Sequence, residues 1–69
     1  MTFELNGQEF IELNKLLKLT GVAESGGFAN MVIIEEAVKV NGETEIRKRK
    51  KLHKGDVVEF NGERIDIVA

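Results

Sequence analysis

A run of five consecutive basic residues, Arg47-Lys48-Arg49-Lys50-Lys51, is the feature of this sequence with the clearest chemical use. Lysine and arginine side chains bind phosphate groups and displace the counterions of a polyanion. The run is unusual here because the 69 residues carry a net charge of -2, with -4 over residues 1–38 and +2 over residues 39–69. On charge alone, a phosphate-binding surface and a solvated strand or loop are equally good interpretations.

His53, the only histidine, follows this run, and no cysteine, serine or aspartate is placed to form a catalytic relay with it. A lone histidine among basic residues is more often a loop residue, although its protonated form can donate to phosphate. No group of acidic residues and histidine has the spacing of metal ligands, and the neighbouring Glu35 and Glu36 would point about 100° apart on a helix. The sequence therefore predicts no catalytic residue, no metal and no cofactor.

Ser25-Gly26-Gly27 is a second candidate contact for anions, because the amides at a helix N-terminus attract phosphate. The three residues lack the longer spacing of a P-loop or a dinucleotide-binding motif. The simpler interpretation is a serine cap followed by glycines that permit a close turn. We favour the cap and keep an auxiliary phosphate contact as the alternative.

One strand and two helices are expected ahead of the basic run. Alternating polar and apolar residues over 2–5 predict a strand at a sheet edge. Helical spacing then runs from Glu9 to Thr20 and places Gly21 where a C-cap belongs. A second helix is expected to begin after Ser25, a favourable N-cap, and to fade near residue 37.

The first predicted helix also has a favourable order of charges, since its glutamates come early and its lysines late along the macrodipole. These charged residues are Glu9, Glu12, Lys15 and Lys18. The side chains expected to face the core from the first strand and the two helices are Phe3, Leu5, Phe10, Leu13, Leu16, Leu17, Phe28, Val32 and Ile33.

The clearest β-hairpin lies at the end of the sequence, where Asn61-Gly62 separates residues 57–60 from residues 63–68. Asn-Gly favours the type I′ turn, whose twist matches that of paired strands. A two-residue turn sets Glu59 opposite Arg64 as a cross-strand pair of opposite charge. The apolar residues Val58, Phe60, Ile65 and Ile67 then share one face.

A second Asn-Gly pair, Asn41-Gly42, follows the segment Val38–Val40. A two-residue turn there would place the two valines on the face of Glu43 and Glu45. We therefore predict a three-residue turn with a glycine bulge, which restores an apolar face. This bulged turn pairs Val40 with Thr44 and Val38 with Ile46.

The exposure of the basic run depends on the conformation of the segment after this turn. If a strand continues from Ile46 to Leu52, side-chain alternation sends Arg47, Arg49 and Lys51 outward and leaves Lys48 and Lys50 on the inner side. An irregular segment before Lys54-Gly55-Asp56 would remove that alternation.

The length of 69 residues predicts one domain covering 1–69 with a small core. The absence of cysteine excludes a disulfide framework, and we expect a reducing cytoplasm. The longest apolar run, Met31–Ile34, is far shorter than the roughly 20 residues that cross a bilayer, so no membrane span is expected.

Taken together, residues 13–19, a helix opened by Ser25, the sequence Val38-Lys39-Val40-Asn41-Gly42 and the sequence Lys54-Gly55-Asp56 resemble a known family. This family is the RNA-binding domain named after small-subunit ribosomal protein four, also called the alpha-L motif. The added N-terminal strand, the basic run and the closing hairpin make the whole chain similar to its stand-alone bacterial YbcJ-like members. The resemblance implies binding to structured RNA by two helices and an adjacent basic strand or loop.

Some positions depart from the family pattern. Glu12 and Asn14 stand where the first helix of the family commonly has an arginine and an aspartate, and Glu24, Gly26 and Gly27 replace basic residues around the second helix. We therefore expect RNA affinity to come mainly from residues 47–54. All four phenylalanines have core positions, so recognition of RNA shape and backbone is expected in place of base stacking.

The sequence thus favours a non-catalytic RNA-binding module of the α+β class, with two antiparallel helices packed on a small, mostly antiparallel sheet. The expected partner is structured RNA, either ribosomal or transfer RNA, with no membrane and no small-molecule substrate, and the protein is expected to be a cytoplasmic monomer. The alternative is a protein–protein adaptor that keeps the fold and binds an acidic protein partner. The residues expected to contact RNA are Lys18, Arg47, Lys48, Arg49, Lys51, His53 and Lys54.

Overall fold

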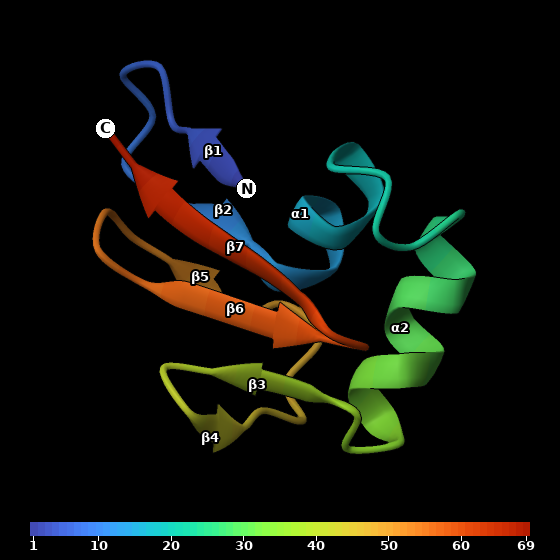
Figure 1. The fold of residues 1–69 in the computed structure, drawn as a ribbon. Coiled ribbons are helices and arrows are strands. Elements are labelled where there is room, and N and C mark those ends of the chain that lie inside the picture. Colours follow the sequence, from blue (N-terminus) through green and yellow to red (C-terminus); the bar gives the residue numbers. More distant parts are fainter.

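The computed structural model describes residues 1–69 and combines two helices with two β-sheets (Figure 1). The main sheet has five strands in the order β1-β7-β6-β3-β4, and only its β1–β7 pair is parallel. The second sheet is a short antiparallel pair, β2–β5. The predicted α+β class is confirmed. The elements are β1 (Thr2–Glu4), β2 (Ile11–Glu12), α1 (Leu13–Leu19), α2 (Gly26–Ile34), β3 (Val38–Val40), β4 (Glu43–Thr44), β5 (Lys51–Leu52), β6 (Val57–Phe60) and β7 (Glu63–Val68).

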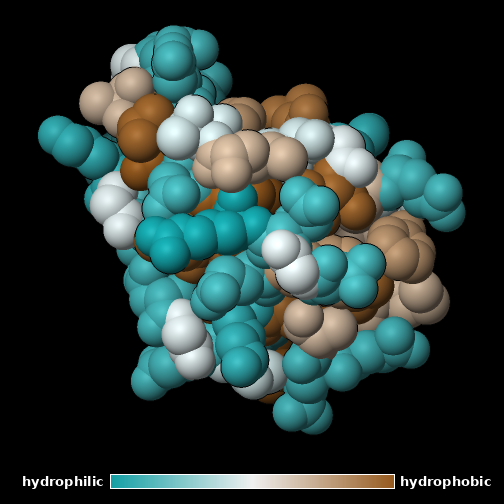
Figure 2. Space-filling view, viewed as in Figure 1, coloured by the Kyte–Doolittle hydropathy of each residue, from teal (hydrophilic) through white to brown (hydrophobic).

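The core is one apolar cluster that joins both helices to the main sheet and to β5. α2 stands beside the end of the sheet where β6 finishes and β3 begins (Figure 1). The surface over the strands is mostly hydrophilic, whereas hydrophobic atoms come to the surface over α2 (Figure 2). No helix is long and apolar enough to cross a membrane. The buried members are Leu5, Ile11, Leu13, Leu16, Leu17, Ala23, Ala29, Val32, Ile33, Val38, Val40, Leu52, Val58, Ile65 and Ile67.

The first helix begins later than the sequence pattern predicted. It starts at Leu13, with Glu12 as its N-cap residue, so no acidic residue lies in its first turn. The preceding Ile11 pairs with Leu52 in the β2–β5 ladder, and both side chains are buried. Tertiary pairing therefore overrides the helical spacing of residues 9–12. The C-terminal end is as predicted, since Gly21 follows the Thr20 cap with φ +80°.

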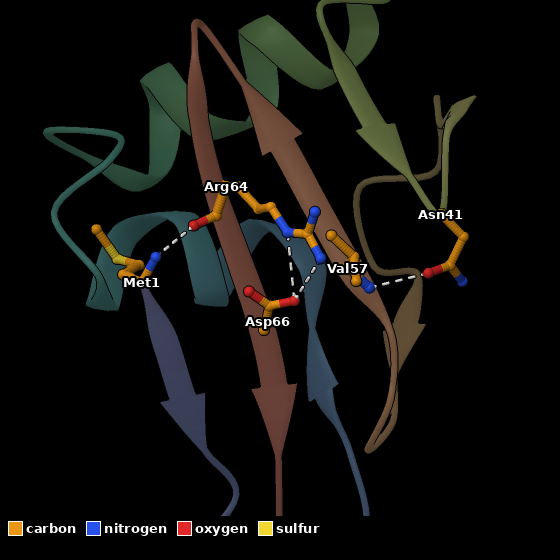
Figure 3. A network of polar contacts seen from close by, with 5 residues as sticks. All are labelled: Met1, Asn41, Val57, Arg64 and Asp66. Atoms are coloured by element: carbon orange, nitrogen blue, oxygen red, sulfur yellow. Dashed lines mark hydrogen bonds and ion pairs between the residues drawn. The ribbon is translucent and has the colours of Figure 1, made fainter.

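The closing hairpin has the predicted two-residue turn and register, with Val58 opposite Ile65 and Glu59 opposite Arg64. Its turn residues Asn61 and Gly62 both have positive φ, as a type I′ turn requires. The predicted charge pair is wrong in one respect, because the Arg64 guanidinium turns along its own strand. Its Nη2 atom lies 3.1 Å from Oδ1 of Asp66, as Figure 3 shows.

The predicted glycine bulge between β3 and β4 is wrong. Asn41-Gly42 forms a two-residue turn that pairs Val40 with Glu43 and Lys39 with Thr44. The register problem is solved in another way, because β4 is only two residues long and both are exposed. The apolar face that we expected Ile46 to complete is not formed, and Ile46 is 61% exposed.

Glu45 accordingly lies on the inner side of this hairpin. Its amide donates to the carbonyl of Val38 over 3.0 Å, and the residue is only 8% exposed. A buried carboxylate needs a partner of opposite charge, and Arg47 supplies one. The continuous strand considered for residues 46–52 is also absent, since the chain turns at residues 48–49 before β5. Side-chain alternation therefore does not decide which basic residues face outward.

α2 ends in a Schellman motif with an unusual residue in its left-handed position. The amide of Glu36 donates to the carbonyl of Ile33, and the amide of Ala37 donates to the carbonyl of Val32. Glu36 has φ +63°, a conformation that glycine adopts at no steric cost. The backbone at this position is therefore strained.

Replacing Glu36 with glycine should stabilise the fold. The left-handed conformation costs an L-residue about 1–2 kcal/mol, and the extra chain entropy of glycine offsets part of that gain. We expect the free energy of unfolding of Glu36→Gly to rise by about 0.5–1 kcal/mol in urea titrations. The matched control is Glu35→Gly, at a position with φ -77°, which should destabilise the fold. Destabilisation by both substitutions would show that Glu36 is not strained.

Candidate functional site

The basic residues 47–50 form a turn, which we call the basic turn, that is fastened to the start of α1. The amide of Lys50 donates to the carbonyl of Arg47 and closes the turn. The amide of Leu13 donates to the carbonyl of Lys50 over 2.9 Å, and that of Asn14 to the carbonyl of Lys48 over 3.0 Å. These bonds satisfy amides that a helix N-terminus otherwise leaves free. The turn is thus held by its backbone, which leaves its side chains available.

Arg47 is the one residue of the basic run in an ion pair. Its Nε and Nη2 atoms donate to the two carboxylate oxygens of Glu45 at 2.9 and 3.1 Å. Its amide also donates to Glu45 Oε2 over 3.0 Å. The hydrogen bond from the Arg47 side chain is the main cause that lowers the pKa of Glu45. Arg47 is therefore partly neutralised, although 68% of its side chain remains exposed.

A hollow without any hydrophobic lining residue lies beside the basic turn, and we call it the basic hollow. Four of the seven residues predicted to contact RNA line it, together with Lys50, Asn41 and Asp56. The only carboxylate in this lining is that of Asp56, which is committed to hydrogen bonds within the fold. The four predicted residues are Arg47, Arg49, Lys51 and His53.

A second hollow, the α1 groove, runs between β1 and α1 and has apolar side chains among its lining. Lys15 and Lys18 lie on its α1 side, and Glu4 and Glu12 also line it. Arg49 lines this groove as well as the basic hollow. The two hollows therefore share a cation, and Arg49 connects the lysines of α1 with the basic residues of the loop.

Lys48 and Lys54 line neither hollow, although both are exposed. Lys54 lies in the turn of residues 53–56, which the Asp56 carboxylate closes by accepting from the amide of His53 over 2.8 Å. Ser25 is a helix cap, since its Oγ accepts from the amide of Phe28 over 3.1 Å. The capping interpretation of Ser25 is thereby confirmed.

Phe10 was expected in the core, but it is half-buried and lies next to two residues of the basic hollow. The Nζ atom of Lys51 is 4.9 Å from the centroid of its ring, which is a cation–π contact. The ring centroid of His53 is 6.2 Å away. Because Ile11 begins a strand, Phe10 points away from the Ile11 side chain. Recognising that strand in the sequence would have placed Phe10 at this surface.

Asn41 links the two parts of the family motif. Its Nδ2 atom donates to Asp56 Oδ1 over 3.0 Å. Its Oδ1 atom accepts from the amide of Val57 over 2.9 Å, a bond drawn in Figure 3. Its amide also donates to the Val57 carbonyl over 2.8 Å. Burial acts to raise the pKa of Asp56, but the hydrogen bonds from His53 and Asn41 hold it below its ordinary value. Asn41 thus fixes the turn that carries His53 and Lys54.

Substitution of Asn41 should separate its two contributions. Asn41→Gly keeps the backbone conformation and loses the two side-chain hydrogen bonds, so it should cost about 1–2 kcal/mol of unfolding free energy. Asn41→Ala should cost about 1 kcal/mol more because of its positive φ. The control is Asn61→Gly, in the same type of turn but without a side-chain hydrogen bond, which should change stability by less than about 0.5 kcal/mol. Equal effects of the two glycine substitutions would contradict this role.

The lowered pKa values of Glu45 and Asp56 predict a loss of stability in acid. Each carboxylate stabilises the folded state above its ordinary pKa, near 4.5 for Glu45 and 3.8 for Asp56. That stabilisation is lost as the pH falls through the lower pKa of the folded state. Urea titrations from neutral pH down to about pH 2.5 should show a shallower loss for Glu45→Gln and Asp56→Asn than for the parent. Glu43→Gln, at an exposed neighbour without an ion pair, should follow the parent curve.

Comparisons with known proteins identify the family of this chain. Residues 3–68 match the S4 domain family. YbcJ of Escherichia coli (strain K12), provisionally named an RNA-binding protein, is 46% identical over 68 residues, which cover 99% of this chain and 97% of YbcJ. RlbA of Bacillus subtilis (strain 168), provisionally named a ribosome maturation protein, is 46% identical over 54 residues, which cover 78% of this chain and 76% of RlbA.

A solved structure extends the likeness to the fold. The solution structure of YbcJ from E. coli, described as revealing an alpha-L motif involved in RNA binding, superposes with a TM-score of 0.76. The match covers 99% of this chain and 86% of that structure at 46% identity. The two halves of the motif that suggested the family from sequence meet through Asn41 and Asp56. The chain belongs to the S4 domain family and has the alpha-L fold of YbcJ.

Proposed function

We propose that this protein is a non-catalytic module that binds structured RNA through the cations around Arg49. The observation that carries the proposal is the position of Arg49, which lines both the basic hollow and the α1 groove. It connects the lysines of α1 with those of the loop, so cations from distant parts of the sequence form one surface. The name of YbcJ points to RNA, and that of RlbA points to maturation of the ribosome.

The electrostatics of this surface suit a polyanion. Residues 47–54 contain six lysines and arginines, and only Arg47 among them is in an ion pair. The fixed backbone of the basic turn means that little backbone entropy is lost when the turn meets phosphates, and the remaining entropic cost is that of ordering its side chains. We assign phosphate contacts to Lys18, Lys48, Arg49, Lys51, His53 and Lys54, with a weaker contribution from Arg47 because of its pairing with Glu45.

Shape and charge, more than base identity, would set the preference for RNA. None of the four phenylalanine rings is exposed, and the half-buried Phe10 is already covered in part by Lys51. Stacking of unpaired bases on such a surface is weak compared with contacts to the phosphates of a folded helix. Structured ribosomal RNA or transfer RNA in the cytoplasm, bound by a monomer covering residues 1–69, is the form of the proposal that we favour.

Salt dependence tests this proposal. Each phosphate contact contributes about -0.7 to -0.9 to the slope of log K against log salt concentration. The triple variant Arg49→Gln, Lys51→Gln and Lys54→Gln should therefore flatten the slope by about 2–3 and weaken binding to a labelled structured RNA. Fluorescence anisotropy over a series of salt concentrations measures both quantities. All three side chains are exposed, so the fold should be kept.

Lys39→Gln is the matched control, since Lys39 is exposed on β3 and lines neither hollow. Lys39 is expected to make no phosphate contact. The variant should therefore keep the slope within about 0.3 of the parent, which is less than the contribution of one contact. An unchanged slope in the triple variant would contradict the proposal. Tight binding of an acidic peptide without binding of RNA would favour the adaptor function. Crosslinking in cells followed by sequencing of the recovered RNA identifies the target.

A further inference from the structure

α2 has the composition of an enclosed helix but lies at the surface. Residues Gly26–Ile34 include no charged side chain, and Asn30 is the only one with a polar side chain. A helix that is apolar on all sides is normally surrounded by protein. Here Ala29, Val32 and Ile33 are buried, whereas Met31 is 45% exposed and Ile34 is 57% exposed.

The exposed residues of α2 form one face. Gly27, Met31 and Ile34 follow the spacing i, i+4, i+7, so they lie along a single line of the helix, and we call them the α2 face. Phe28, half-buried, borders this face and packs edge-on against Phe60 with ring centroids 6.4 Å apart. Figure 2 shows the hydrophobic surface over α2. The exposed apolar side chains of the α2 face are those of Met31 and Ile34, one helical turn apart.

Carboxylates are the only charged groups that the adjoining chain provides. Glu35 follows Ile34 directly and lies one helical turn from Met31, Glu36 comes next, and Glu24 precedes the Ser25 cap. All three are exposed and none is in an ion pair. No lysine or arginine occurs between Lys18 and Lys39. Such a patch repels the phosphates of RNA and attracts a cationic partner.

The strained backbone of Glu36 fits this role. A glutamate at φ +63° is less stable than glycine would be, and it makes no ion pair within the fold. Strain of this kind collects at functional positions, where a side chain is needed despite its cost. The side chain that glycine would lack is the exposed Glu36 carboxylate, two residues after Ile34.

The size and charge of the face argue against a second copy as its occupant. Its nine residues span roughly 14 Å, and a stable interface buries about 1,200–2,000 Å² in total. A second copy would also present carboxylates and no cation from the same face. A short segment is small enough for this face, and its own basic residues supply the cations that a second copy lacks.

We propose that the α2 face docks a short, basic, amphipathic segment of another protein. Apolar side chains of that segment pack on Met31 and Ile34, and its lysines or arginines meet Glu35 and Glu36. This docking uses the side chains of α2, and the proposed RNA contacts use the basic turn and α1. The two proposals therefore stand or fall separately.

The test uses a synthetic helical peptide of roughly 15–18 residues, with leucines along one face and lysine or arginine elsewhere. Added to the isotope-labelled protein, it should shift the NMR signals of Met31, Ile34 and Glu35. The double variant Met31→Lys and Ile34→Lys should weaken binding about tenfold or more, since both anchors are lost. Glu35→Gln with Glu36→Gln should weaken binding less and reduce its salt dependence.

The matched control is Ile46→Lys, which replaces an equally exposed apolar residue elsewhere, and it should leave the affinity unchanged. Equal binding of a peptide with the same composition in scrambled order, or of one with glutamate in place of its basic residues, would overturn the proposal. Shifts confined to other surfaces would also overturn it. So would dimerisation through α2 in sedimentation experiments, or RNA-induced shifts centred on Met31 and Ile34.

Discussion

The hydrogen bonds from the first amides of α1 to the carbonyls of the basic turn are the constraint on which the rest of this structure depends. Leu13 and Asn14 donate to Lys50 and Lys48, residues more than thirty positions later in the chain. The first amides of a helix lack acceptors within the helix, and a run of like charges repels itself. The carbonyls of the basic turn supply the acceptors, and the same hydrogen bonds hold the turn in place. The result is a set of cations whose backbone is fixed by a helix in the core.

The fold was predictable where local rules and burial agree. The closing hairpin follows from Asn61-Gly62 and its apolar alternation, and the cap of α2 follows from Ser25. The start of α1 and the β3–β4 turn were not predictable, because both depend on partners that the polar–apolar pattern does not show. Ile11 is drawn into a strand by Leu52, and Glu45 is accepted on an inner face because Arg47 neutralises it. The pattern of apolar residues alone does not predict a buried ion pair.

The candidate site was predictable in composition but not in shape. The basic run is evident from the sequence, and four of the seven expected RNA contacts line one hollow. Lys15 and Lys18 were visible as the two cations of the first predicted helix, whereas the position of Phe10 depends on the pairing of Ile11 with Leu52. The Asn-Gly and Lys-Gly-Asp sequences were recognised as parts of one motif, which suggests that their turns lie close together. The hydrogen bonds from Asn41 that join the turns could not be predicted, because the two sequences are far apart along the chain.

The uneven charge of the sequence also has a spatial meaning. Carboxylates adjoin α2 and cations surround Arg49, while the helix between the carboxylates carries no charge at all. If RNA were bound by both helices, phosphates would have to approach Glu24, Glu35 and Glu36 without a nearby cation. Salt screens this repulsion only in part when a phosphate comes within about 8 Å of a carboxylate, which is the Debye length at physiological salt. The RNA-binding surface that we propose therefore lies on the side of the molecule formed by α1 and the basic turn, which leaves α2 for the second proposed partner.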